Sequence, residues 1–381
     1  MPYDIKCAAY YFPGYHPERR NDPVHGPGWT EWELMKCARP RFAGHDQPKI
    51  PLHGWGDESD PGEMAVKIEE ASGHGIDAFV FDWYWYDGPY LQGALDRGFL
   101  RAPNRGKMKF ALMWANHNWR NFHPGGRDVD YMVLFRSLVT EKGAAAVWDH
   151  ILERYMSHPQ YWRVEGKLYF AIYSVNRFIL QLGGPEKARK VLDLFREKTA
   201  RAGLGELHIN GIWFDMLEKD AELLECPQEE WVSRLGIDSY TSYNSTGATE
   251  TWKRAKETFP RIDYAETCRQ YFEIAGRAIR KLPAPYYPVM TVGWDSTPRT
   301  IQSDTFLPGA YPWFAVMEPD PETFENALAK LRDLVFEHTP AHREKLLFIN
   351  AWNEWSEGSY LEPDTLRKYA FLDAVKRVLD R

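Results

Sequence analysis

Short apolar runs alternate with longer segments of helical periodicity along most of the chain. The runs have the length of buried strands, and the segments between them repeat apolar residues every three or four positions, as a helix packed on one face does. The predicted strands are 5–11, 78–83, 110–114, 168–173, 207–214, 236–240, 289–292 and 346–350. The predicted helices are 61–74, 90–100, 143–156, 185–202, about 221–235, 251–281, 321–337 and 366–379.

Eight strand–helix units in succession predict an α/β protein that folds as a (β/α)8 TIM barrel. Two of the helices begin with strong start signals, Asp60-Pro61 and Asp320-Pro321. No Gly-x-Gly-x-x-Gly follows a predicted strand, which disfavours a dinucleotide-binding sheet. No linker or repeat divides the chain, so we expect residues 1–381 to form one domain.

The first connection, residues 12–60, is unusually long and has little periodicity. Loops of this length are usually functional or disordered. Its tryptophans and histidines, which include Trp29, Trp32 and His53, are not typical of a disordered segment. We therefore expect an ordered loop over one end of the barrel, with a purely structural excursion as the alternative.

Composition narrows the classes of partner. The net charge of −7 argues against nucleic acid or an anionic membrane surface. No apolar run reaches the length of a membrane span, and no signal peptide is visible, so a cytoplasmic location is expected, although an exported protein trimmed of its signal would look the same. The four cysteines are scattered, which predicts reduced thiols and no zinc site. The sequence does not indicate an oligomeric state.

Aromatic, amide and acidic residues recur just after the predicted strands, where a TIM barrel builds its active site. The 16 tryptophans and 21 tyrosines suit a pocket that stacks the apolar faces of sugar rings. The candidate substrate-binding residues are Tyr11, Trp29, Trp32, His53, Asp82, Trp83, Trp114, Asn116, His117, Asn118, Trp213, Tyr240, Trp294, Asp295, Trp352 and Asn353. Each alone could equally be a core residue, a helix cap or a loop residue.

The most informative segment follows the last predicted strand and carries Glu354 and Glu357 among tryptophans. Two carboxyl groups so placed can reach one small volume, where one acts as acid and the other as base. The alternative is a surface loop with two solvated glutamates. Other chemistries fit less well, because Gly-x-Ser-x-Gly and His-Glu-x-x-His are absent. Asp128-Val129-Asp130 is a short metal-binding pattern that arises often by chance, so we expect neither metal nor cofactor.

Several motifs together resemble a known family. They are Tyr10-Tyr11-Phe12-Pro13, Trp29-Thr30-Glu31-Trp32, Gly44-His45-Asp46-Gln47-Pro48, Trp114-Ala115-Asn116-x-Asn118-Trp119, Gly293-Trp294-Asp295, Trp352-Asn353-Glu354-Trp355-x-Glu357-Gly358 and Tyr360-Leu361-Glu362-Pro363. In this order they resemble the WbsX-like group related to glycoside hydrolase family 99. The resemblance spans about residues 8–364 and implies a barrel that acts on glycans.

Family 99 enzymes are retaining endo-α-mannosidases or mannanases, so the resemblance implies hydrolysis of an α-linked, mannose-like oligosaccharide or polysaccharide. It makes Glu354 the base that acts on the substrate's own 2-hydroxyl, through a 1,2-anhydro sugar, and Glu357 the acid/base. His117 stands where the WbsX-like pattern has a glutamate, which changes the expected subsite. The group is also labelled glycosyltransferase in O-antigen and lipopolysaccharide synthesis. That activity and a non-catalytic carbohydrate-binding barrel are the alternatives.

Overall fold

The computed structural model describes residues 4–212 and 233–379. Its main sheet contains nine parallel segments, in the order β11-β10-β9-β8-β4-β2-β1-β13-β12. These strands are β1 (Lys6–Tyr11), β2 (Ala78–Trp85), β4 (Lys109–Trp114), β8 (Lys167–Ile172), β9 (Leu207–Ile212), β10 (Ser239–Thr241), β11 (Tyr286–Tyr287), β12 (Val289–Thr291) and β13 (Leu346–Asn350).

The two ends of this order are consecutive in the chain, because only Pro288 separates β11 from β12. β11 pairs with β10, and β12 pairs with β13, all in parallel. Proline lacks the N–H that a ladder needs, which explains the interruption. The two segments are thus one broken seventh strand, and the sheet forms the predicted eight-unit barrel.

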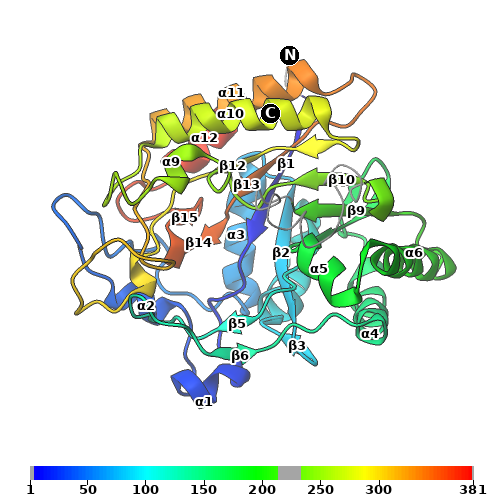
Figure 1. The fold of residues 1–381 in the computed structure, drawn as a ribbon, viewed down its shortest axis with the longest axis horizontal. Helices are drawn as coiled ribbons and strands as arrows, with labels where there is room; N and C mark the ends of the chain where they lie inside the picture. The colour runs from blue at the N-terminus through cyan, green and yellow to red at the C-terminus, as the bar shows by residue number, and fades with distance from the viewer. Residues whose placement is uncertain (1–3, 213–232, 380–381) are drawn as a thin grey trace.

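Helices surround the strands, as a parallel barrel requires (Figure 1). Asp60 and Asp320 cap the predicted helix starts by accepting backbone N–H bonds from the first turns of α3 and α11. The longer helices are α3 (Pro61–Gly73), α4 (Glu141–Ile151), α5 (Val175–Leu182), α6 (Pro185–Arg201), α10 (Tyr264–Lys281), α11 (Pro321–His338) and α12 (Ala370–Leu379). One apolar cluster contains residues from Ile5 to Leu379, which is consistent with a single domain.

Two helix predictions are wrong in detail. The segment 90–100 forms no α-helix: it contains the end of β3 (Pro89–Tyr90), a π-helical turn at Ala94–Gly98 and a short 3-10 turn. The segment 251–281 is divided into α9 (Glu250–Lys253) and α10, with Pro260 in the break between them. Most of the predicted helix 221–235 lies outside the described residues.

The long first loop is ordered, as predicted, and contains two short helices, α1 (Asp22–His25) and α2 (Trp32–Cys37). Phe12, Tyr15 and Trp32 form a second apolar cluster with Trp119 and Trp355 from other loops. In Figure 1 this loop lies beside two small hairpins, β5 (Trp119–Arg120) with β6 (Val133–Phe135), and β14 (Asn353–Glu354) with β15 (Ser359–Tyr360). Within the described part of the chain, no helix combines the length and apolarity that a membrane crossing requires.

Candidate active site

A cavity of about 300 Å³ opens among the segments that follow the carboxyl ends of the barrel strands. Of the predicted residues, it brings together Asp82, His117, Trp294, Glu354 and Glu357. The other lining residues are Phe12, Tyr84, Ala115, Trp119, Phe122, His123, Tyr173, Tyr243, Asn244, Arg299 and Tyr311. Carboxyl groups, one guanidinium and aromatic faces therefore share one concave site.

Glu354 lies at the end of hairpin strand β14 and is 4% exposed. Its Oε1 accepts a hydrogen bond of 2.8 Å from the Tyr243 hydroxyl. Its Oε2 accepts no hydrogen bond from a described residue, although Arg299 Nη2 lies 3.5 Å away. Burial raises the pKa of Glu354 well above its usual value, and the charge of Glu357 adds to this, while Arg299 opposes it.

Glu357 ends a 3-10 turn three residues later and is held differently. Its Oε1 accepts two hydrogen bonds, at 2.5 Å from Arg299 Nη1 and at 2.7 Å from the Tyr311 hydroxyl. Both donors favour the ionised carboxylate. The two glutamates of one motif thus have unlike partners, which is the condition for unlike roles in proton transfer.

Arg299 connects the cavity to the first loop. Its Nη2 donates 2.9 Å to Glu31 Oε2, and its Nε donates 2.9 Å to Ser356 Oγ. Burial raises the pKa of Glu31, but the charges of Arg299 and His123 outweigh it and lower that pKa to about 2. Glu31 and Arg299 therefore form a buried ion pair directly behind the candidate catalytic glutamates.

Asp82, on β2, contacts Glu354 through a shared partner. The Tyr243 hydroxyl lies 2.9 Å from Asp82 Oδ2 as well as 2.8 Å from Glu354 Oε1. Asp82 is 5% exposed, and burial raises its pKa well above the usual value. The lining thus carries three carboxyl groups and one arginine, whose charge Glu31 already balances.

Glu362 holds the two tryptophans of the last motif in place. The indole N–H of Trp352 donates 3.1 Å to Glu362 Oε1, and that of Trp355 donates 2.5 Å to Oε2. Lys67 of α3 balances the carboxylate at 2.6 Å. The two tryptophans on either side of Asn353-Glu354 are fixed to one side chain, so the backbone that presents Glu354 is held from both ends.

Asp295 lies outside the cavity lining, contrary to the predicted contact with substrate. It is fully buried and accepts hydrogen bonds from His45 (2.9 Å), Gln47 (2.6 Å) and Lys49 (3.2 Å) of the first loop. Burial opposes its ionisation, but these partners outweigh that effect and lower its pKa. Asp295 therefore fastens the first loop to the loop that follows β12.

Gly358 allows the last motif to pack closely against the backbone of Asp295. Its φ of 66° is in the left-handed region, and a Cβ there would lie 2.7 Å from the backbone nitrogen of Asp295. That nitrogen donates 2.5 Å to the carbonyl of Glu357. The Gly293-Trp294-Asp295 motif and the Glu357-Gly358 pair are thus neighbours in space, and glycine is the residue that permits their contact.

Several predicted aromatic residues face the helices and not the cavity. Tyr11 lies under the Lys67 ammonium of α3, 5.6 Å from its ring. Trp83 contacts His150 of α4, with ring centroids 6.1 Å apart, and Trp114 contacts Phe178 of α5, at 6.3 Å. Trp352 points to Glu362. Alternate strand residues face opposite sides, so these rings belong to the layer between barrel and helices.

Three predicted amides hold loops instead of lining the cavity. Asn116 bonds the backbone N–H and C=O of Ser174. Asn118 accepts 3.0 Å from the N–H of Ser137. Asn353 bonds both the N–H and the C=O of Phe12. Each ties one strand-end loop to its neighbour, so all three act on the shape of the site from outside it.

The remaining predicted residues also lie outside the lining. Trp32 is buried against Tyr15 and Trp355, and its indole donates 2.8 Å to Gly56 O. Trp29 stacks on His25, and the half-exposed His53 bonds Glu70 at 2.6 Å. Tyr240 packs over Gly211 of β9. Trp213 falls outside the described residues. The first loop thus reaches the lining only through Phe12.

Arg299, Tyr311 and Tyr243 are the main residues that sequence reasoning missed. Arg299 is 5% exposed, and arginine is rarely so buried without a carboxylate partner. A lone arginine in a loop gives no periodic signal, so nothing in the sequence marks it. Tyr243 follows the sixth predicted strand closely and was within reach of the strand-end argument that selected Tyr240.

One other cluster has the geometry of a cation site. Ligand atoms of His45, Asp295 and Glu318 lie within 4.8 Å of one another. The Lys49 ammonium lies 3.2 Å from Asp295 Oδ2 and 2.5 Å from Glu318 Oε1. An ammonium group built into the chain thus supplies the positive charge at this position.

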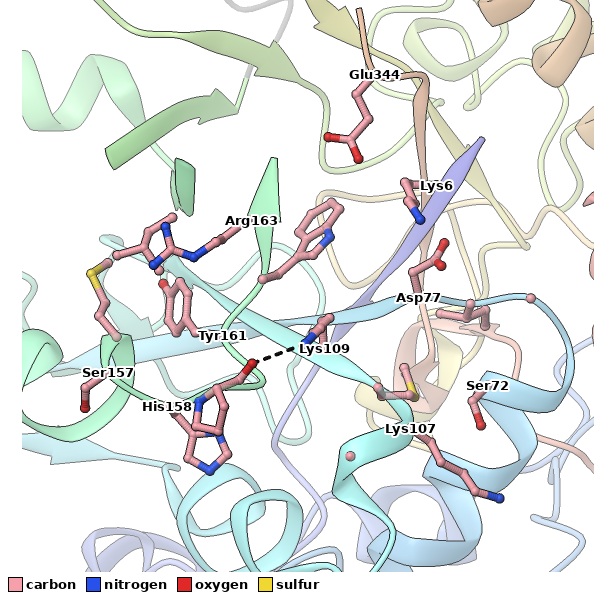
Figure 2. A pocket seen from close by; sticks show the side chains of 18 of the residues that line it. Lys6, Ser72, Asp77, Lys107, Lys109, Ser157, His158, Tyr161, Arg163 and Glu344 are labelled. Carbon is pink, nitrogen blue, oxygen red and sulfur yellow. Dashed lines mark hydrogen bonds between the residues drawn. The ribbon is translucent and has the colours of Figure 1, made fainter. Parts of the chain in front are cut away.

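A larger cavity, of about 600 Å³, lies at the opposite end of the barrel (Figure 2). It is lined by residues at the amino ends of the strands, such as Lys6 and Lys109. Lys109 donates 3.1 Å to the carbonyl of Pro159, and Arg163 donates to two other carbonyls. TIM-barrel chemistry occurs at the carboxyl ends, so the smaller cavity is the candidate active site.

The fold is a (β/α)8 TIM barrel. It is similar to the GH99 endo-alpha-mannosidase from Bacteroides thetaiotaomicron, with a TM-score of 0.61 at 15% identity, over 100% of this chain and 98% of that one. It is equally similar to a protein described as "Glycoside hydrolase-like protein", with a TM-score of 0.61 at 13% identity, over 100% and 96% of the two chains. The predicted (β/α)8 barrel is confirmed.

Residues 7–375 match the family described as "Glycosyltransferase WbsX", and the chain belongs to this family. It is also 28% identical over 384 residues to "Uncharacterized protein WxcX" from two strains of Xanthomonas campestris pv. campestris. That alignment covers 98% of this chain and 49% of each relative. The chain therefore spans about half the length of the curated relatives it matches.

Proposed function

We propose that the protein is a glycoside hydrolase that cleaves an α-linked, mannose-like oligosaccharide or polysaccharide with retention of configuration. The observation that carries this proposal is the convergence of Glu354 and Glu357, both buried and with unlike partners, in a cavity at the carboxyl end of the barrel. The aromatic rings of Phe12, Tyr84 and Trp294 give that cavity apolar faces. These suit the C–H faces of a sugar ring.

In the first step Glu354 takes the proton of the substrate's 2-hydroxyl while that oxygen attacks the anomeric carbon. The bond to the leaving oxygen breaks, and Glu357 gives that oxygen its proton. In the second step Glu357 takes a proton from water as the water attacks the anomeric carbon. The anhydro ring then opens, and Glu354 returns its proton to the 2-oxygen. Two inversions at one carbon give net retention.

The proposed steps start from one ionised carboxyl, Glu354, and neutral Glu357 and Asp82. Arg299 and Tyr311 donate to Glu357, and burial raises the pKa of Glu354, so the acid proton has to be on Glu357, against these contacts, when the first step begins. Burying three carboxylates together is strongly unfavourable, so the cavity retains protons. Arg299 and Tyr311 both bind Oε1 of Glu357, so its acid proton belongs on Oε2, and they favour its ionised form for the second step.

A panel of α-linked oligosaccharides tests the activity, with the anomeric form of the first product followed by NMR. Release of a retained sugar from an α-mannoside supports the proposal. A 2-deoxy analogue should bind and resist cleavage, and intact mass spectrometry during turnover should detect no glycosyl adduct. A trapped adduct on Glu354 or Glu357 would replace the anhydro route by ordinary double displacement.

The family description favours a second candidate, a glycosyltransferase of surface-polysaccharide synthesis. A nucleotide-sugar donor brings a diphosphate, which would face ionised Glu354 in a cavity whose one arginine is already paired. This electrostatic mismatch makes the hydrolase the better-supported proposal. Saturable binding of a nucleotide sugar, together with activity lost in chelator and restored by a divalent ion, would reverse that preference.

A further inference from the structure

The Tyr243 hydroxyl lies between two carboxyl oxygens, 2.9 Å from Asp82 Oδ2 and 2.8 Å from Glu354 Oε1. Both distances are those of hydrogen bonds, and all three groups are buried. A hydroxyl carries one hydrogen and can donate to only one of the two oxygens. The other contact therefore needs a second proton, which one of the carboxyl groups must carry.

The surroundings decide which carboxyl holds that proton. Arg299 Nη2 lies 3.5 Å from Glu354 Oε2 and favours negative charge there, against the opposing effects of burial and of Glu357. Asp82 Oδ1 accepts no hydrogen bond from a described residue, and no arginine or lysine of the described chain forms an ion pair with Asp82. Unpaired buried charge is strongly unfavourable, so the neutral form belongs to Asp82.

We propose that Asp82 is a positioning residue: a neutral carboxylic acid that donates its proton to the Tyr243 oxygen, so that Tyr243 donates its own hydrogen to ionised Glu354. The inference rests on the proposed function, because it assigns Glu354 the role of base. It explains why the hydrogen bond to Glu354 is on Oε1. The other oxygen, Oε2, then remains open to receive the proton of the substrate hydroxyl.

The titration of Glu354 also depends on the other groups that face it from each packed element. They are Asp82 and Tyr84 of β2, Glu31 and Tyr15 of the first loop, Tyr173 after β8, Tyr243 after β10, Arg299 after β12, and Glu357. The tyrosines remain neutral because burial raises their pKa values. The carboxyl groups and Arg299 are thus the charged groups whose effects on the titration of Glu354 have to be distinguished.

The test compares Asp82→Asn, Asp82→Ala and Tyr243→Phe by the pH dependence of kcat/KM. An asparagine amide donates to Tyr243 as a neutral acid does, so Asp82→Asn should keep the acid limb within about half a pH unit of wild type. Tyr243→Phe removes a hydrogen bond to a charged group and should move that limb upward by about one unit or more. Asp82→Ala should fall between them.

Two outcomes of the pH profiles would overturn the proposal. A downward shift of a unit or more in Asp82→Asn would mean that Asp82 is ionised and repels charge on Glu354. An unmoved limb in Tyr243→Phe would mean that the hydroxyl does not act on the base at all. Thermal melts of all three variants exclude unfolding as the cause of a change.

Infrared difference spectra locate the proton without any substrate. At neutral pH the carbonyl band of a protonated carboxylic acid should be present in wild type and in Glu354→Gln, and it should weaken in Asp82→Asn. Protonated Glu357 contributes to the same band, so a residual band is expected in every variant; weakening of the band in Glu354→Gln, with no change in Asp82→Asn, would place the proton on Glu354 and overturn the proposal. If no glycan is cleaved but the band depends on Asp82, the proton assignment stands and only the catalytic role assigned to Glu354 fails.

Discussion

Glu31 Oε2 accepts a hydrogen bond of 2.9 Å from Arg299 Nη2, and both side chains are buried. The first residue belongs to the long loop after β1 and the second to the loop after β12. Arg299 also contacts Glu354 and Glu357, so this one ion pair links the loop to both candidate catalytic residues. The loop therefore acts on the chemistry indirectly, through the charge that it places behind Arg299.

Glu31→Gln should lower the free energy of unfolding and make it depend less on pH in the acid range. The folded-state pKa of about 2, against an ordinary 4.5, means that the folded protein binds this proton more weakly than the unfolded chain. The stabilisation, about 3 kcal/mol, is therefore complete above about pH 5 and is lost as the pH falls toward 2. Urea unfolding between pH 3 and 7 measures it. An equal acid dependence in wild type and variant would contradict the prediction.

Glu357→Gln should reduce kcat by about 10²–10⁴-fold and leave ligand affinity nearly unchanged, because the amide keeps the shape but cannot give or take the proton. Calorimetric titration with the oligosaccharide measures affinity, and initial rates measure turnover. Glu337→Gln, on the exposed end of α11, is the matched control. A residual rate within threefold of wild type would remove Glu357 from the mechanism.

Glu362→Ala should destabilise the protein by about 3–5 kcal/mol, since it leaves the Lys67 ammonium without its partner and two indole N–H groups without an acceptor. Glu362→Gln keeps an acceptor and should recover part of that loss. The free energy of unfolding in urea provides the measurement. Variants as stable as wild type would show that the two tryptophans do not depend on this carboxylate.

Trp294→Ala should affect mainly substrate binding, whereas Trp32→Ala should affect mainly stability. Trp294 lines the cavity, so its loss should raise KM by about tenfold or more while the fold persists. Trp32 packs behind the cavity against Tyr15 and Trp355, so its loss should lower the melting temperature more than it changes KM. A large KM effect from Trp32 with an unchanged melting temperature would place Trp32 itself in direct contact with substrate.

The sequence alone predicts the barrel and the two glutamates because both leave local signals. Apolar runs of strand length alternate with capped helices, and Glu354 and Glu357 are in one short motif after the last strand. The alternation of side chains along β2 separates Asp82 and Tyr84, which line the cavity, from Trp83 between them, which faces α4. The period of two predicts that Trp83 and its two neighbours face opposite sides of the sheet. It does not predict which of these sides faces the inside of the barrel.

The contacts of Arg299, Tyr243 and Asp295 depend on loops far apart in the sequence. Arg299 and Glu31 are separated by 268 positions, and Asp295 and His45 by 250. No single segment encodes such pairs, because each partner acquires its neighbour only when the barrel closes. This is why Asp295, predicted at the sugar site, turns out to hold the first loop in place.

The first loop carries two buried ions, Glu31 and Lys49, and each is paired with a charged side chain in another segment of the described chain. Lifting the loop would separate every one of these ions from its partner, at several kcal/mol each. The loop is therefore held in one position, and under the proposed function a sugar would enter the cavity through an opening of constant shape. Engineering a new sugar preference should therefore begin with the exchange of the 117–123 segment, which carries His117 and His123 into the cavity.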